Sequence, residues 1–141
     1  MSMPIPSREA VATLVNNAGR NEPLRSEAAC IAVFTSLFPP AFRGGGPIRS
    51  TEALVVSSPT GLTPVVLAGD RDLGEVDPLP VERNCWVKYG DVPVYYASLK
   101  SPRKLFAAFA AVKKEKPAIL HFNSFFAPHL TIIPLMLWRL G

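Results

Sequence analysis

Short apolar runs alternate along the chain with segments whose apolar residues recur at helical spacing. The β-branched and aromatic run CIAVFTSLF predicts a strand at residues 30–35 that is buried on both faces. TPVVLAG, residues 63–69, predicts a second strand, and AILHFNSFF, residues 118–126, predicts another buried strand. Strands that alternate with helices indicate βαβ units, so we expect a three-layer, Rossmann-like α/β fold with a mostly parallel sheet.

Three segments carry the signals of helices. The first begins near Pro47, which a first helical turn accepts, and extends for about three turns. The clearest has Ser101 as N-cap and Pro102 at its first position, and Pro117 stops it. PHLTIIPLMLWRLG predicts a third, in which Pro134 disturbs the helix unless it lies in or near the first turn.

Two further segments complete the chain order. CWVKYGDVPVYYAS, residues 85–98, predicts two strands around the turn YGDVP, which we interpret as an inserted β-hairpin. DRDLGEVDPLPVERN, residues 70–84, is a long acidic loop of a kind that is often functional. Residues 1–29 are mostly polar and predict a flexible extension, so we expect one domain at residues 30–141.

The composition fits a globular domain: 48% of the residues are hydrophobic and 18% are charged. Residues 118–138 lack Lys, Arg, Asp and Glu over a length that could cross a bilayer, but they hold polar residues and prolines, which favours a buried strand plus a helix. The net charge of +4 favours anionic partners such as phosphate groups or acidic lipid. We expect no nucleic-acid partner.

The cysteines indicate neither a metal site nor a disulfide. Cys30 and Cys85 are isolated, without CxxC spacing or a nearby pair of histidines. A reduced, cytoplasmic location fits them, and the first thirty residues lack the apolar core of a secretory signal. We therefore expect no metal and no cofactor, and a cytoplasmic protein that either stays in solution or contacts the inner face of the membrane peripherally.

A glycine cluster separates the first strand from the first helix, in FPPAFRGGGPIRSTEAL. Gly44, Gly45 and Gly46 would lie at the carboxyl ends of parallel strands, where the free N–H groups of a helix start suit a phosphate. The spacing is neither GxGxxG nor a P-loop, although Asp70 follows the second strand where a ribose-binding acid could sit. A tight turn without a ligand is the alternative interpretation.

Three stretches together resemble the N-terminal half of a bacterial family-4 glycosyltransferase with the GT-B fold. They are AVFTSLFPPAFRGGGPIRSTEAL, VVLAGDRD and KPAILHFNSFFAPHLTIIPLMLWRLG, and the resemblance covers residues 30–141. It implies sugar transfer from a nucleotide-sugar to an acceptor hydroxyl with retention, in cell-envelope or exopolysaccharide synthesis. The N-terminal domain of that family chiefly binds the acceptor, and its glycine loop, here residues 44–46, approaches the donor diphosphate.

The strand ILHFNSFF departs from that family, whose members often carry two alternating histidines there. This chain has His121 and Asn123 at those positions, on one face of the strand. Asn cannot act as a general base, but it can hydrogen-bond a hydroxyl group of the acceptor or the sugar. His121 and Asn123 are therefore candidates for a catalytic role. A core histidine is an equal interpretation of His121. The resemblance further implies acceptor or sugar contacts from Arg49, Asn123 and Ser124.

The donor-binding machinery of the family lies in a second domain, which the resemblance does not reach. We therefore expect the 141-residue chain to be inactive alone, as a truncated frame, an excised domain, or a subunit that pairs with a separate donor-binding chain. The alternative is a non-catalytic module that binds a phosphate-bearing ligand or a partner. Whether the chain is an enzyme stays open on the sequence alone.

Overall fold

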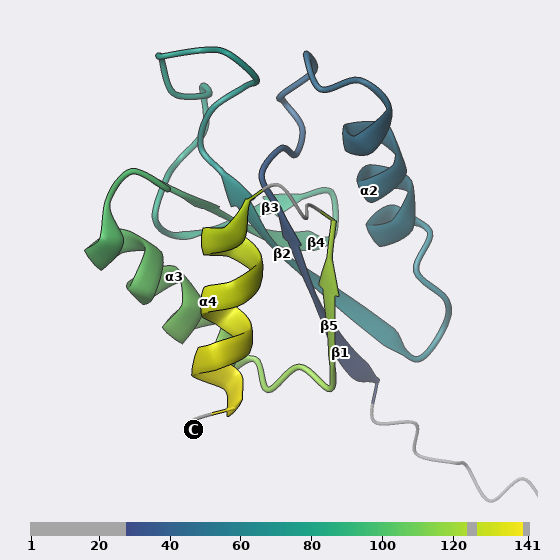
Figure 1. Cartoon of the computed structure of the whole chain (residues 1–141). Helices are drawn as coiled ribbons and strands as arrows, with labels where there is room; N and C mark the ends of the chain where they lie inside the picture. Colours follow the sequence, from purple (N-terminus) through teal and green to yellow (C-terminus); the bar gives the residue numbers. More distant parts are fainter. Residues whose placement is uncertain (1–27, 124–126, 140–141) are drawn as a thin grey trace, which may run out of the picture.

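The computed structural model describes residues 28–123 and 127–139, which form an α/β domain (Figure 1). A five-stranded sheet has the order β3-β4-β2-β1-β5 and is parallel except for β3. The elements are β1 (Ala29–Thr35), α2 (Gly46–Val56), β2 (Leu62–Gly69), β3 (Trp86–Tyr89), β4 (Val92–Ala97), α3 (Pro102–Lys114), β5 (Ile119–Phe122) and α4 (Pro128–Arg139).

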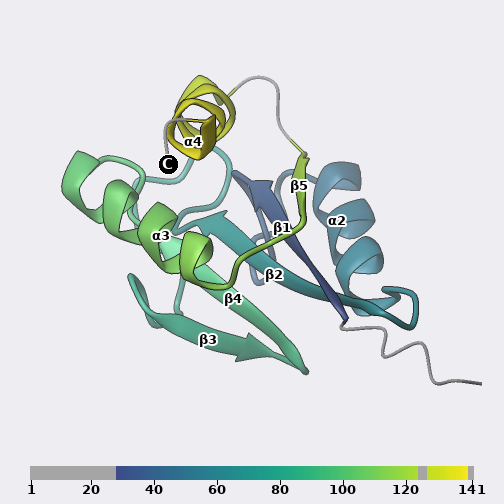
Figure 2. The ribbon, with the colours of Figure 1, turned by 90° about the horizontal axis from the view of Figure 1, so that it is seen from below.

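The helices cover both faces of the sheet, which confirms the three-layer arrangement. Figure 2 shows α3 and α4 on one side of the strands and α2 on the other. Side chains alternate between these two sides along each inner strand: Phe34 and Leu67 belong to the core under α3 and α4, whereas Val33 and Val66 belong to the core under α2. Such a mostly parallel sheet is compatible with a Rossmann-like fold.

The predicted hairpin exists, but it is not an insertion. β3 pairs antiparallel with β4, and β4 pairs in parallel with β2, so that β4 is an interior strand of the main sheet and β3 is an edge strand. The physical reason is that VPVYYA is apolar on both faces, and five of its six residues are buried. The long loop after Gly69, together with β3, replaces a crossover helix between β2 and β4.

β5 differs from the expectation of a fully buried strand. It pairs with β1 alone, its residues are half-buried or exposed, and Ile119 is 44% exposed. It therefore forms the second edge of the sheet within the described residues. The strand ends at Phe122, and residues 124–126 of the predicted strand lie outside the described residues.

Helix α4 begins at Pro128, so that Pro134 lies inside the helix and not in its first turn. Pro134 is buried together with Leu130 on the side that faces the sheet, whereas Ile132, Leu135 and Met136 are exposed. In the part of the chain that the structure describes, no helix is long and apolar enough to cross a membrane. The predicted extension lies almost entirely outside the described residues, and Ala29 already belongs to β1.

Candidate functional site

The candidate site lies where the carboxyl ends of the parallel strands meet the start of α2. From β1 the chain moves to β2 on one side and later returns to β5 on the other side, so the strand order reverses between β1 and β5. Ligands of open α/β sheets bind outside the carboxyl ends of the strands at such a point. Figure 1 shows the loops after β1 and β2 at this same end of the sheet.

The three glycines have different physical roles. Gly45 is the N-cap of α2 with φ +61° and ψ −120°, a conformation that disfavours any residue with a Cβ atom. Gly44 is packed closely, because a Cβ there would lie 2.5 Å from Cδ1 of Leu37 and 3.0 Å from Cδ1 of Ile48. A Cβ at Gly46 would meet nothing within 4 Å. Gly44 thus allows close packing, Gly45 turns the chain, and Gly46 leaves open space beside the backbone.

The start of α2 is suited to an anion. The Gly45 N–H donates to the Phe42 carbonyl, and the Arg49 N–H donates to the Gly45 carbonyl at 3.3 Å, which closes the first helical turn. The N–H groups inside a first turn have no acceptor in their own helix, and Pro47 has no N–H, so Gly46 and Ile48 offer theirs. No acidic residue lies in this first turn, so no carboxylate of the turn opposes a phosphate there.

Asp72 fastens the glycine loop to the loop that follows β2. Its carboxylate accepts hydrogen bonds from the N–H groups of Phe42 at 3.0 Å, Arg43 at 3.2 Å and Leu73 at 2.7 Å. Burial alone would raise the pKa of Asp72, but the N–H groups and the charge of Arg43 outweigh it and hold the pKa below its ordinary value. Arg43 also pairs with Glu75 at 2.7 Å. The sequence analysis missed Asp72; its only signal was its place in the acidic loop.

A cavity of about 300 Å³ opens beside the glycine loop. Its wall includes Gly45, Ile48, Arg49 and Glu52 of the α2 segment, and on the other side the residues around the cis peptide bond between Pro39 and Pro40. The structure therefore brings two of the predicted site residues, Gly45 and Arg49, to one cavity.

Two tyrosines hold the walls of this cavity. Tyr89 donates to Oε1 of Glu52, and Tyr96 donates to the carbonyl of Pro39. The hydrogen bond to Glu52, then burial, raises the pKa of Tyr89. Burial, with a smaller contribution from Tyr89, raises the pKa of Tyr96 to about 12. Both phenols consequently remain protonated at neutral pH and keep donating.

Asn123 joins the end of β5 to helix α2. Its backbone N–H donates to the Phe34 carbonyl at 2.9 Å, and its side-chain amide donates to Oγ1 of Thr51 and to the Pro47 carbonyl at 3.4 Å. The amide is thus engaged within the fold beside the first turn of α2. It does not line the cavity that holds Arg49.

His121 lies opposite Val33 in the parallel pairing of β5 with β1. Its neighbours Leu120 and Phe122 pack against the core under α3 and α4, so His121 faces the α2 side, as does Asn123. No hydrogen bond of the His121 ring is found within residues 28–123 and 127–139, so a backbone partner for a core histidine is not seen there. Ser124 lies outside the described residues.

Among the residues that the structure describes, no three or more His, Cys, Asp and Glu side chains are grouped so as to hold a metal ion. Both cysteines are free thiols, and burial, then the nearby Glu115, raises the pKa of Cys30. No protein-family model matches the chain, and neither the curated proteins nor the solved structures contain a significant match. Any assignment of function therefore depends on the chemistry of the site and on the resemblance described above.

Proposed function

We propose that this domain is the acceptor-side half of a retaining glycosyltransferase, which moves a sugar from a nucleotide-sugar to an acceptor hydroxyl. The observation that carries the proposal is the start of α2, where Gly45 at φ +61° turns the chain into a helix N-terminus, and where Asn123 after β5 donates to the Pro47 carbonyl. Negative charge develops on the diphosphate as it leaves the sugar, and N–H groups fixed in this way stabilise it. The reaction class comes from the resemblance.

The cavity beside Gly45 supports binding of a polar ligand next to the diphosphate. Its volume of about 300 Å³ is at the lower end of the range for small-molecule sites. Arg49 supplies hydrogen-bond donors and Glu52 an acceptor, the complementary pair that sugar hydroxyl groups need. Glu52 is held by Tyr89, so its carboxylate does not have to be ordered by the ligand.

Fixation of the loop by Asp72 also supports the proposal. Electrostatic stabilisation is effective when the donors are already in place before charge develops, because no reorganisation is then needed. Two of the three backbone N–H groups that Asp72 binds, those of Phe42 and Arg43, belong to the loop between β1 and the glycines, so Asp72 fixes that loop.

A second candidate is a non-catalytic module that binds a phosphate-bearing ligand. The observation that favours it is Asn123, which stands where the family often has its second histidine and whose amide is engaged by Thr51 and Pro47. In this candidate the start of α2 still binds phosphate, but no sugar is transferred. The two candidates therefore differ in turnover and not in anion binding.

Anion binding is tested first, by titrating the ¹⁵N-labelled 141-residue chain with pyrophosphate and recording ¹H–¹⁵N spectra. Saturable shifts are expected at the amides of Gly44, Gly45, Gly46 and Ile48. The start of α3, which also follows a parallel strand and has Pro102 in its first turn, is the internal control. Shifts confined to α3, or none at either helix, contradict both candidates.

Turnover separates the two candidates. The purified chain is incubated with nucleotide-sugars, alone and together with a separately expressed GT-B donor-binding domain, and release of nucleoside diphosphate is measured. The proposal expects release only from the mixture. Release from the 141-residue chain alone, well above a heat-killed control, would contradict the division of labour between two domains. Pyrophosphate binding without turnover in the mixture supports the non-catalytic module.

A further inference from the structure

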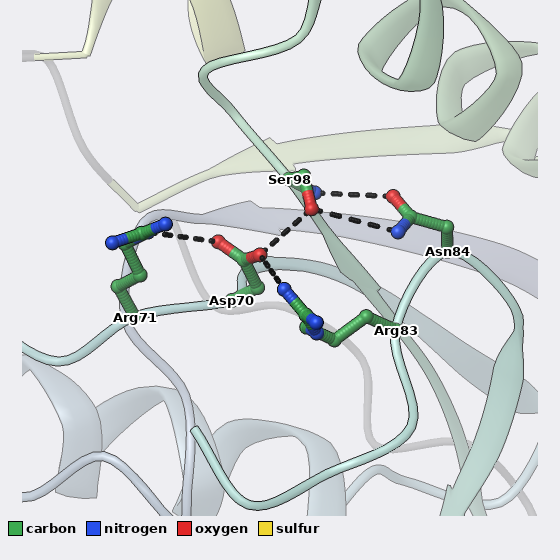
Figure 3. A network of polar contacts seen from close by, with 5 residues as sticks. All are labelled: Asp70, Arg71, Arg83, Asn84 and Ser98. Carbon is green, nitrogen blue, oxygen red and sulfur yellow. Dashed lines mark hydrogen bonds and ion pairs between the residues drawn. The ribbon is translucent and has the colours of Figure 1, made fainter. Parts of the chain in front are cut away.

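Five polar side chains form a cluster at the carboxyl ends of β2 and β4, apart from the glycine loop (Figure 3). Asp70 directly follows β2, and Ser98 directly follows β4. Arg71 follows Asp70, while Arg83 and Asn84 come from the end of the long loop before β3. We name these five residues the Asp70 cluster. Neither the glycine loop nor the cavity beside Gly45 includes any of them.

The centre of the cluster is a rigid, buried carboxylate. The Asp70 side chain is 4% exposed, and its Oδ2 accepts a hydrogen bond from the Ser98 hydroxyl at 2.7 Å. The backbone of Asp70 donates to the Ala97 carbonyl and accepts from the Leu79 N–H. Asn84 in turn accepts a hydrogen bond from the Ser98 N–H at 3.2 Å. The carboxylate is thus fixed by the sheet and does not depend on the arginines for its position.

Two guanidinium groups approach this one carboxylate, and neither makes a close pair with it. Figure 3 shows Arg71 at Oδ1 and Arg83 at Oδ2. The Nε of Arg71 is 3.8 Å from Oδ1, and NH1 of Arg83 is 3.4 Å from Oδ2. Charge-assisted pairs of Arg with a carboxylate are usually bidentate at about 2.7–2.9 Å. Most of the guanidinium donors are consequently not used by Asp70.

Arg71 has guanidinium donors that none of the described residues binds closely. Its side chain is only 29% exposed, yet within residues 28–123 and 127–139 no acceptor lies at hydrogen-bond distance from its guanidinium. No side-chain nitrogen of the described residues is fully buried and unpaired, so the donors of Arg71 are open to the outside. They can reach a ligand at the edge of the sheet where ligands bind.

The attachment of the long loop does not require two arginines. The loop is already held by the hydrogen bonds from Leu79 to Asp70 and from Asn84 to Tyr96, and by the bridge between Arg71 and Pro78. One cation is enough to neutralise Asp70, and the two guanidinium groups with one carboxylate leave the cluster at +1. A second guanidinium that is neither needed for charge nor saturated with acceptors is therefore available for a ligand.

We propose that Arg71 and Arg83, positioned by Asp70, bind an oxyanion group of a ligand, either a phosphate or a carboxylate. The fork of a guanidinium matches the oxygen pair of both groups. This site is separate from the one expected for the donor diphosphate at the start of α2. That the oxyanion belongs to the acceptor substrate rests on the proposed function; binding of the oxyanion does not. Ser98 is a positioning residue that holds Asp70, and Asn84 in turn holds Ser98.

The test is an NMR titration of the labelled 141-residue chain with inorganic phosphate, methyl phosphate and acetate, each at constant ionic strength set with sodium chloride. The arginine Nε–Hε signals report directly on the two guanidinium groups. We expect saturable shifts of the Arg71 and Arg83 signals with phosphate, acetate or both, and the better ligand identifies the chemical group. Linear shifts without saturation, or equal shifts with chloride, would overturn the proposal.

Variants separate binding from a structural role. Arg71→Gln is expected to weaken the better oxyanion about tenfold or more, since it removes charge-assisted hydrogen bonds, while Arg71→Lys weakens it less. Arg103→Gln removes an exposed arginine from α3 and should leave binding unchanged. A lower melting temperature of R71Q with unchanged affinity would mean that Arg71 only holds the loop. Shifts at Gly44–Gly46 without shifts at Arg71 leave the proposed function standing and refute this site.

Discussion

The two helical layers hold the sheet in different ways. On the α3 and α4 side the contacts are mostly apolar and aromatic: Phe34 stacks on Phe122 with ring centroids 5.0 Å apart, and Phe109 lies 6.3 Å from Phe34. The α2 side has an apolar core of its own, which includes Phe38 and Ile48, but polar side chains also fix the helix and its preceding loop. Asn123 donates to Thr51, and Asp72 binds the loop. Hydrogen bonds require a direction as well as a distance, whereas apolar contacts are not directional.

This difference separates the energetics of the fold from the geometry of the site. We expect substitutions under α3 and α4 to change the free energy of unfolding and to leave anion binding intact in the folded fraction. Substitutions at the start of α2 should change anion binding more than their effect on unfolding would explain.

The largest effect is expected at Leu130 in α4. Its side chain is 1% exposed and belongs to the core between α4 and the sheet. Leu130→Ala should lower the free energy of unfolding by about 2–5 kcal/mol, because it removes buried methyl groups and leaves a cavity. Urea unfolding measures this. Leu135→Ala in the same helix is the matched control, since Leu135 is exposed and should change the free energy by about 0.5 kcal/mol or less.

We expect pyrophosphate still to shift the amides of Gly44–Gly46 in L130A under conditions where that variant is folded. The core under α4 would then contribute to stability without positioning the site. Loss of those shifts at a urea concentration and temperature that leave the chain folded would mean that the core under α4 also positions the site. The contrast between the two layers would then fail.

Gly45→Val is the corresponding change on the α2 side. Val opposes a φ of +61° and should cost about 1–3 kcal/mol of folding free energy. Gly90→Val is a matched control, because Gly90 also has a positive φ, +59°, and a Cβ at either position would meet nothing within 4 Å. Pyrophosphate binding should be lost in G45V and kept in G90V. Equal binding by both variants would show that the glycine loop is only a connector.

Local sequence patterns predict most of the elements of both layers. Ser101 and Pro102 mark the start of α3 to the residue, since these signals act within the first helical turn. Its end at Lys114 comes three residues before the predicted stop, Pro117. The run from Cys30 to Thr35 gives β1 except for one residue. The place of β4 was not predictable in this way, because alternating apolar residues identify a strand without identifying its neighbour.

The sequence predicts the glycine loop of the site, but not the side chains that hold this loop in place. Gly44, Gly45 and Gly46 stand out in the sequence, and their place before a helix follows from Pro47. The group that holds them, Asp72, is about thirty residues away along the chain from its partner Phe42, and no local pattern links the two. The same applies to the amide of Asn123 on Thr51. Long-range polar contacts depend on the complete fold, and a single sequence does not encode them as a motif.

Asp72 gives a smaller effect that depends on pH. Its pKa is lowered in the folded chain, so the carboxylate stabilises the fold at pH values above its ordinary pKa of 3.8, and this stabilisation is lost as the pH falls through the folded value. Asp72→Asn should therefore cost about 1–2 kcal/mol at pH 7. The difference from the wild type should shrink below about pH 4.

Urea unfolding at several pH values measures this difference. Asp91→Asn, in the exposed turn between β3 and β4, is the control for loss of a carboxylate elsewhere. A D72N penalty that is the same at pH 3 and pH 7 would mean that the shape of the side chain matters there and its charge does not.

The smallest effect on folding for each residue replaced, but a clear effect on association, is expected on the outer face of α4. Ile132, Leu135 and Met136 are 54%, 47% and 61% exposed and lie at i, i+3 and i+4 on one helix, so they form a continuous apolar patch. Replacing all three by Gln should change the free energy of unfolding by only about 0.5 kcal/mol for each residue. Sedimentation without detergent should show self-association of the wild-type chain at micromolar concentration and a monomer for the triple variant.

Leu54→Gln with Val56→Gln on α2 is the control, because both side chains are exposed on the other layer. If the wild-type chain is a stable monomer, or if the α2 variant also abolishes association, the apolar face of α4 is not a contact surface, and the layers differ only in how they hold the sheet.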